Sequence, residues 1–236
     1  VMHHLATLTF LAVALLPPIL QAQDPAPKPP RPAIKKINDA EYKIGKVHLN
    51  KATREISFGA GVNLTEGLLE FIIVNQKGKI HESLFISDIS PLNLNIALKL
   101  LGIKESPELF EIVDEDYRPT GQYPEVAPKT KAAARMDIFV EWGKEKKRVT
   151  LNELILNNVT EKTMDPGPWL NTGSYIHEGK FKAEVTGDLI AVFTSQPAMI
   201  NYPGKDREND DIWITNTKRA PKEGTVVKII IKPHQP

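Results

Sequence analysis

Short apolar runs separated by turn-forming residues recur along most of this chain, and they constrain its fold more than any other feature. Two alternating runs that flank a short polar turn predict a β-hairpin. Four such pairs are present: residues 47–49 with 56–58, 68–74 with 79–87, 136–142 with 147–151, and 181–185 with 189–193. Residues 226–231 (VVKIII) predict a further, buried strand. The chain is therefore expected to form a β-rich domain, mainly antiparallel, either sandwich-like or a twisted mixed sheet.

One segment reads clearly as an α-helix. Ser90 suits the N-cap and Pro91 the first helical position, and Gly102 is placed to end the helix. An apolar stripe lies between them, at Leu94, Ala97, Leu98 and Leu101. We expect this single helix to cover one face of the sheet.

The first 41 residues predict export. Residues 5–16 (LATLTFLAVALL) resemble the apolar core of a secretory signal, and Ala22 offers a cleavage site. The run is too short for a membrane span, which needs about 20 residues. Residues 1–22 are therefore assigned to a signal peptide, 23–41 to a proline-rich linker and 42–236 to one domain. The expected location is periplasmic or secreted; an uncut signal would leave the domain tethered to a membrane.

Composition limits the partners and cofactors. The formal net charge of +1 gives no electrostatic reason to expect nucleic acid as a partner. The chain has no cysteine, which excludes disulfides, thiolate metal sites and iron–sulphur clusters. We predict no cofactor and no metal, and an unknown envelope or extracellular ligand as the partner.

A polar group inside the second predicted hairpin is the first candidate site. It consists of Glu70, His81, Glu82 and Ser83. If residues 75–78 all form the loop, Glu70 lies opposite Ser83 with His81 diagonal to it. If Gly78 is instead a left-handed bulge, Glu70 and Glu82 share one face while His81 and Ser83 share the other. Turn chemistry favours the second register, which argues against a Ser-His-Glu triad.

Two tryptophans and two aspartates are the remaining candidates. Trp169 and Trp213 are expected in loops among polar residues, where they either cover a core edge or line a sugar- or peptide-binding groove. Asp210 and Asp211 lie in an acidic loop that lacks the ligand spacing of an EF-hand. His48, His177 and His234 have no partners at metal-binding spacing.

Several motifs, in order, resemble one family. They are residues 61–85 (GVNLTEGLLEFIIVNQKGKIHESLF), IALKLLG at 96–102, Glu141-Trp142, Gly167-Pro168-Trp169, Thr172-Gly173-Ser174 and Asp210-Asp211-Ile212-Trp213. Together they are similar to the YdjY-like domain of exported bacterial proteins, over residues 42–231. That family is functionally uncharacterised. Some relatives are described as ferredoxin-like iron–sulphur proteins, a role that a cysteine-free chain cannot take over.

We therefore expect a binding or cell-envelope interaction module rather than an enzyme. The alternative is a metal-assisted hydrolase that uses Glu70, Glu82 and His81, with Asp210 or Asp211 contributed by a loop. An enzyme needs these groups to converge in a cleft. A binding module needs an accessible groove at Trp169 or Trp213.

Overall fold

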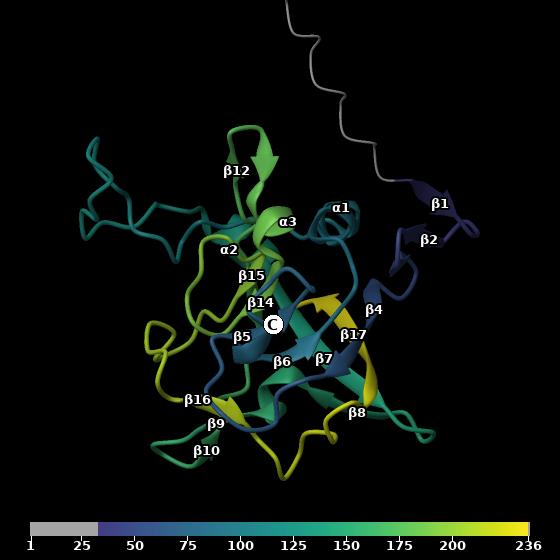
Figure 1. The fold of residues 1–236 in the computed structure, drawn as a ribbon. Helices are drawn as coiled ribbons and strands as arrows, with labels where there is room; N and C mark the ends of the chain where they lie inside the picture. Colours follow the sequence, from purple (N-terminus) through teal and green to yellow (C-terminus); the bar gives the residue numbers. More distant parts are fainter. Residues whose placement is uncertain (1–32, 236) are drawn as a thin grey trace, which may run out of the picture. The chain divides into compact units, whose positions relative to one another are not determined.

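The computed structural model describes residues 33–235 (Figure 1). The predicted signal peptide and most of the predicted linker lie outside these residues. The strands are β1 (Ile34–Lys36), β2 (Glu41–Ile44), β3 (Val47–Asn50), β4 (Glu55–Val62), β5 (Phe71–Val74), β6 (Ser83–Ile86), β7 (Arg135–Trp142), β8 (Lys147–Thr150), β9 (Ile155–Asn157), β10 (Lys162–Thr163), β11 (Trp169–Asn171), β12 (Ile176–His177), β13 (Lys180–Phe181), β14 (Asp188–Ala191), β15 (Ile200–Asn201), β16 (Trp213–Thr215) and β17 (Val226–Pro233). β1 falls in the segment assigned to the linker and pairs with β2.

The helices are few and short. They are the α-helices α1 (Pro91–Leu101), α2 (Pro128–Ala133) and α3 (Lys182–Thr186), and the 3-10 helices η1 (Ile80–Glu82) and η2 (Leu151–Leu154). Among residues 33–235, no helix has the length and apolar character needed to cross a membrane. We predicted a single covering helix, whereas the described residues contain three α-helices. The predicted bounds of the covering helix, now α1, are confirmed.

The main sheet closes on itself. Within the described residues, eight strands follow one another in the order β4, β17, β7, β11, β15, β14, β5 and β6, and β6 pairs again with β4. The sheet is mixed, because β5 pairs with β6 and β14 with β15 in parallel. A β-rich mixed sheet was predicted correctly, but it forms a barrel and not a sandwich. β9, β10 and β16 form a separate three-stranded sheet, at the lower left of Figure 1.

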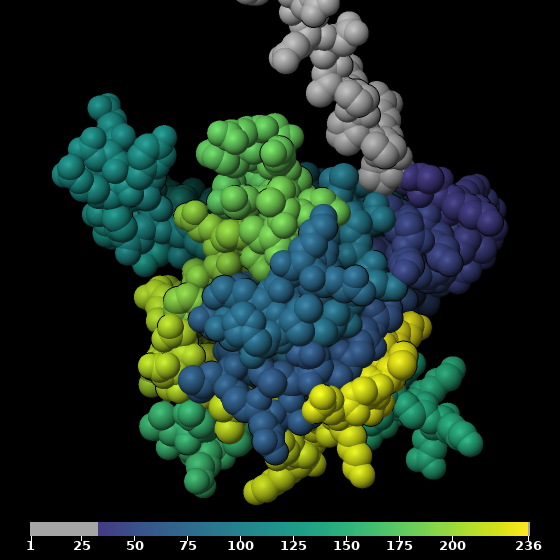
Figure 2. Space-filling model, in the orientation of Figure 1, coloured from purple at the N-terminus to yellow at the C-terminus, as the bar shows by residue number. Residues whose placement is uncertain are grey.

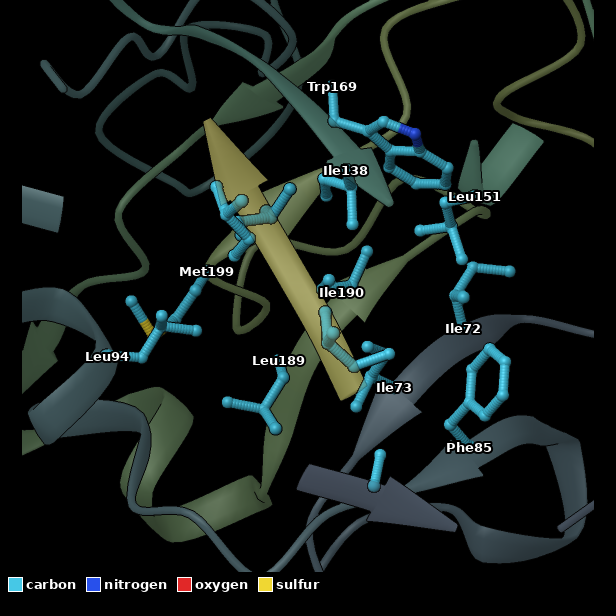
Figure 3. Packing of buried hydrophobic residues seen from close by; sticks show 14 of the residues in the cluster. Ile72, Ile73, Phe85, Leu94, Ile138, Leu151, Trp169, Leu189, Ile190 and Met199 are labelled. Carbon is cyan, nitrogen blue, oxygen red and sulfur yellow. The ribbon is translucent and has the colours of Figure 1, made fainter. Parts of the chain in front are cut away.

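The core cluster in the barrel takes alternate side chains of β17. Val227, Ile229 and Ile231 belong to this cluster, Val226 and Lys228 are exposed, and Ile230 is buried outside it. Because successive side chains of a strand point to opposite faces, this alternation places one face in the core. Figure 3 shows residues that fill this core, among them Leu94 of α1, Met199 and Leu189.

Helix α1 is held at both ends by the caps that the sequence predicted. Ser90 Oγ accepts a hydrogen bond from the backbone N–H of Asn93, and Gly102 adopts a left-handed conformation with φ 84°. A distant residue adds to the N-terminal cap. Glu184 Oε2 accepts hydrogen bonds from Ser90 Oγ (2.7 Å) and from the N–H of Leu92 (3.1 Å). A carboxylate there is favourable because the free N–H groups and the helix dipole attract negative charge.

Two predicted hairpins are confirmed and two are wrong. β3 with β4, and β7 with β8, pair antiparallel across the predicted turns. Residues 181–193 do not form a hairpin, because Lys182–Thr186 is the helix α3 and β14 pairs with β5 and β15 instead. Gly59-Ala60-Gly61 does not interrupt the strand, because β4 continues through it in regular register with β17.

The more consequential correction concerns residues 68–87. β5 and β6 are parallel, with Phe71 beside Ser83 and Ile73 beside Phe85, so neither proposed hairpin register applies. The turn itself is present, since the N–H of Gly78 donates to Asn75 O (3.0 Å). Gly78 is not left-handed; a Cβ there would lie 2.6 Å from Cβ of Val74. Helix η1 then carries the chain back to the start of β6.

Residues 111–127 form a long, mostly exposed loop that leads into α2. This loop forms the teal projection at the upper left of Figure 2. The acidic residues there serve local structure: Asp114 Oδ1 accepts from the N–H groups of Asp116 and Arg118, and Asp116 forms an ion pair with Arg118.

We predict that truncation after Thr225 prevents cooperative folding. It removes β17, which pairs with β4 on one side and β7 on the other, and so opens the barrel. Removing residues 33–38 takes away only β1, an edge strand whose three residues are all exposed, and should shift the melting temperature by a few degrees at most. Thermal melts followed by circular dichroism compare the two. An unchanged cooperative transition in the chain without β17 would contradict this account of closure.

Candidate functional site

Lys79 lies at the centre of the polar group that the sequence singled out. Its Nζ is 2.6 Å from Glu70 Oε2 and 3.2 Å from Glu82 Oε2. It also lies 5.6 Å from the centroid of the Phe71 ring. The two glutamate side chains are 21% and 28% exposed, whereas that of Lys79 is 51% exposed. The two carboxylates therefore share one partly solvated ammonium group.

The pKa shifts match this ion cluster. Burial raises the pKa of Glu82, but the close contact with Lys79 and its positive charge more than offset this effect, so the pKa lies below its usual value. The hydrogen bond to Glu70 is the main reason that the pKa of Lys79 is raised. Lys79 and Glu82 consequently stay charged at neutral pH and attract each other.

His81 and Ser83 do not form a catalytic pair. The His81 side chain is 78% exposed, and its Nε2 lies 3.5 Å from Glu82 Oε1. Ser83 is fully buried, and its Oγ donates to the backbone carbonyl of Lys79 (2.6 Å). A hydroxyl that is buried and already donating to the backbone is a poor nucleophile.

Asn63 completes the structural role of this segment. Its Nδ2 donates to the backbone carbonyls of Ile80 (2.7 Å) and Ser83 (2.8 Å). The N–H of Glu70 donates to Glu82 O (3.2 Å). These hydrogen bonds connect η1, at both of its ends, to the residues that directly follow β4 and directly precede β5. The polar residues between Asn63 and Ser83 thus stabilise a short connection between parallel strands.

The loop acids stay apart from this cluster. Asp210 and Asp211 are exposed, and the N–H of Asp211 donates to Asn209 Oδ1. Among residues 33–235, no three His, Asp or Glu side chains are grouped so that they could hold a metal ion. The donor set that the hydrolase alternative requires is therefore not assembled around Glu70 and Glu82.

Both candidate tryptophans are in strands and are buried, contrary to the prediction that they lie in polar loops. Trp169 in β11 is fully buried, and its Nε1 donates to Asn152 Oδ1 (2.9 Å). Trp213 in β16 is 4% exposed, and its Nε1 donates to Asp206 O (3.3 Å). Tyr202 lies between them, with ring centroids 5.7 Å from Trp169 and 5.6 Å from Trp213. These three rings form a row that begins in the barrel core.

The row ends at a pocket of about 220 Å³. Tyr202 and Trp213 contribute its aromatic, largely buried wall, and exposed charged side chains contribute much of the rest. The complete lining is Asn157, Thr160, Lys162, Thr163, Met164, Asp165, Tyr202, Lys205, Asp206 and Trp213. The pocket thus combines residues of the small three-stranded sheet with the loop that follows β15. Trp169 does not line it.

Tyr202 is tightly held at this pocket. Its ring end lies against Gly204, where a Cβ would come within 2.2 Å of Cζ and Oη. Burial raises the pKa of Tyr202, and the nearby charges of Asp165 and Asp206 raise it further. The phenol therefore stays neutral at physiological pH and keeps its O–H group as a hydrogen-bond donor.

Apart from Trp213, sequence reasoning missed the residues that line this pocket, because they come from separate segments and match no motif. It also missed a pair formed by Asp137 and His234, whose Oδ1 and Nδ1 lie 2.8 Å apart. They meet because β17 pairs with β7, with Pro233 beside Met136. Both line a second pocket of about 300 Å³ near Phe139. The alternation of apolar and polar residues in β7 and β17 was the only available signal. It indicates two strands, but it does not indicate which residues of the two strands lie beside each other.

The comparisons with known proteins assign the chain to one family. A family model described as the YdjY domain matches residues 47–232. The chain therefore belongs to the YdjY domain family, as its motifs predicted. No curated protein and no solved structure matches the chain significantly.

We predict that Glu82→Gln lowers the free energy of unfolding at neutral pH by about 0.5–1 kcal/mol, the range of a partly exposed ion pair. The pKa of Glu82 is depressed in the folded state, so this stabilisation is present above its ordinary value of 4.5 and is lost as the pH falls through the folded-state pKa. Urea denaturation at several pH values measures the difference, which should shrink in acid.

Glu66→Gln, which changes an exposed glutamate of the same segment, is the matched control. Zinc, calcium and manganese should leave the melting temperature of the wild type and of Glu82→Gln unchanged. A cation-dependent rise confined to the wild type would replace the ion-pair interpretation with a metal site.

A second prediction concerns Tyr202. Asp206→Asn should lower the pKa of Tyr202 toward its usual value, because one of the two negative charges near the phenol is removed. The pKa should remain raised, since burial is the larger cause. NMR titration of ring-labelled tyrosine follows each phenol separately. Asp210→Asn, in the same loop but not lining the pocket, should have less effect; an equal effect of both changes would contradict the proposed proximity.

Proposed function

We propose that this chain is an exported binding module that holds a small ligand in the pocket at Tyr202 and Trp213. The pocket has an aromatic wall fixed by the core and a polar rim carried by loops. Sites of this kind hold a ligand by apolar contact and orient it with a few polar groups. The row of three rings is the observation that carries the proposal, because it gives the pocket a rigid wall before any ligand arrives.

The polar group around Lys79 favours binding over hydrolysis. A metal-assisted hydrolase would need Glu70 and Glu82 to face a metal ion or a water molecule. Their carboxylates contact Lys79 instead, and the Ser83 hydroxyl donates to the backbone. These contacts support a structural role for the segment.

Export is proposed from the sequence. The apolar run at residues 5–16 and the proline-rich segment after Ala22 have the order of a secretory signal and a spacer. A domain without cysteine needs no oxidising compartment to fold, and the closed barrel with its buried core is consistent with stability outside the cell. The binding pocket would then be presented to the periplasm or the medium.

The test is a pocket-blocking variant. Thr160 lines the pocket and is exposed, so Thr160→Trp should fill the mouth with an indole. Thermal shift assays would screen amino acids, short peptides, mono- and disaccharides and nucleosides at millimolar concentration. A ligand present at ten to a hundred times its Kd should stabilise the wild type by about 1.4–2.7 kcal/mol. We expect at least one class to do so, and Thr160→Trp to abolish the effect.

Val159→Trp is the control, because Val159 is 74% exposed and does not line the pocket. Ligands that stabilise Thr160→Trp as well as the wild type would refute the pocket.

Intact-mass analysis of the secreted or periplasmic protein should show a start near Gln23. Full-length chain in the cytosol would refute export.

A further inference from the structure

We infer that the pocket at Tyr202 and Trp213 takes a small zwitterion, namely a free α-amino acid or a short peptide. Its ammonium group would lie at Asp165 and Asp206, its carboxylate at Lys162 and Lys205, and its apolar part against the rings. The inference rests on the proposed binding function and specifies the chemistry of the same site.

The charges of the rim are the first argument. Asp165, Asp206, Lys162 and Lys205 all line the pocket, so two negative and two positive side chains surround one small volume. None of the four forms an ion pair with any residue between positions 33 and 235. Opposite charges that share a pocket without pairing leave both signs available to a ligand. A zwitterion supplies a counter-charge to each.

The position of the acids is the second argument. Asp165 and Asp206 line the pocket together with Tyr202 and are close enough to it for their charges to act on its phenol, so carboxylates adjoin the aromatic wall. An ammonium group placed there is attracted by the carboxylates, and ring faces attract cations as well. The neutral Tyr202 hydroxyl remains able to hydrogen-bond a ligand oxygen.

The size of the pocket is the third argument. Its volume of about 220 Å³ falls below the range of about 300–1,000 Å³ that is typical of sites for drug-sized ligands. Water occupies about 30 Å³ per molecule in the liquid, so a volume of this size suits an amino acid or a short peptide. A neutral sugar could enter, but its hydroxyl groups would give none of the four rim charges a counter-charge.

The test compares zwitterions with derivatives that lack one charge. Isothermal titration of the mature protein with the common L-amino acids and with dialanine identifies the best probe. Its N-acetyl and C-amide derivatives are then titrated. We expect each blocked derivative to bind at least tenfold more weakly, a difference of about 1.4 kcal/mol.

Charge-removing variants tie the loss to named residues. Asp165→Asn and Asp206→Asn should weaken binding of the zwitterion but change the already weak binding of its N-acetyl derivative little. Lys162→Gln and Lys205→Gln should also weaken binding of the zwitterion, and they should change the already weak binding of its C-amide derivative little. Asp210→Asn and Lys144→Gln remove exposed charges that do not line the pocket, and they should leave all affinities unchanged.

The outcomes separate this inference from the proposed function. Binding of a neutral saccharide that Thr160→Trp blocks, with no binding of zwitterions, would overturn the inference and leave the binding function standing. Equal affinity for a zwitterion and its two blocked derivatives would also overturn it. Binding of no probe of any class by the wild type would overturn both.

Discussion

The closure of the main sheet depends on one strand that serves three neighbours. β4 pairs with β17 along one edge, and on its other edge it pairs first with β3 and then with β6. The change of partner occurs around Gly59, whose carbonyl accepts a hydrogen bond from Ser87 Oγ (2.7 Å). Because every buried backbone group needs a partner, this arrangement gives both edges of β4 a pairing strand and closes the eight-stranded barrel, while β1 and β8 remain edge strands attached to it.

The family segment at residues 61–85 serves that closure. Parallel strands are usually joined by a dozen or more residues, whereas Asn75 to Glu82 joins β5 to β6 directly. So short a connection has to be fixed by side chains. Asn63 Nδ2 donates to the carbonyls of Ile80 and Ser83, and Lys79 contacts Glu70, just before β5, and Glu82, just before β6. The polar residues that were considered for a hydrolase site are therefore better explained as contacts that hold a barrel strand in place.

The candidate pocket is linked to the same core. Trp169 belongs to the barrel, Trp213 to the small sheet, and Tyr202 packs between them. The aromatic wall of the pocket is thus continuous with the barrel interior, while its charged rim lies on exposed loops. An apolar wall with polar side chains at its rim suits the proposed recognition of a small ligand, and this pocket is separate from the contacts that hold β5 and β6.

The sequence by itself determined the elements whose signals are local. The caps of α1 at Ser90 and Gly102 and the β7–β8 hairpin around Gly143 were predicted correctly, because capping and short turns depend on neighbouring residues. Family membership and the lack of cysteine were also readable. Tertiary structure decided the direction of β6 after the Asn75 turn, because the same turn can precede a parallel or an antiparallel strand. It also decided the pocket, where Asp165 and Tyr202 meet only through strand pairings that no local pattern encodes.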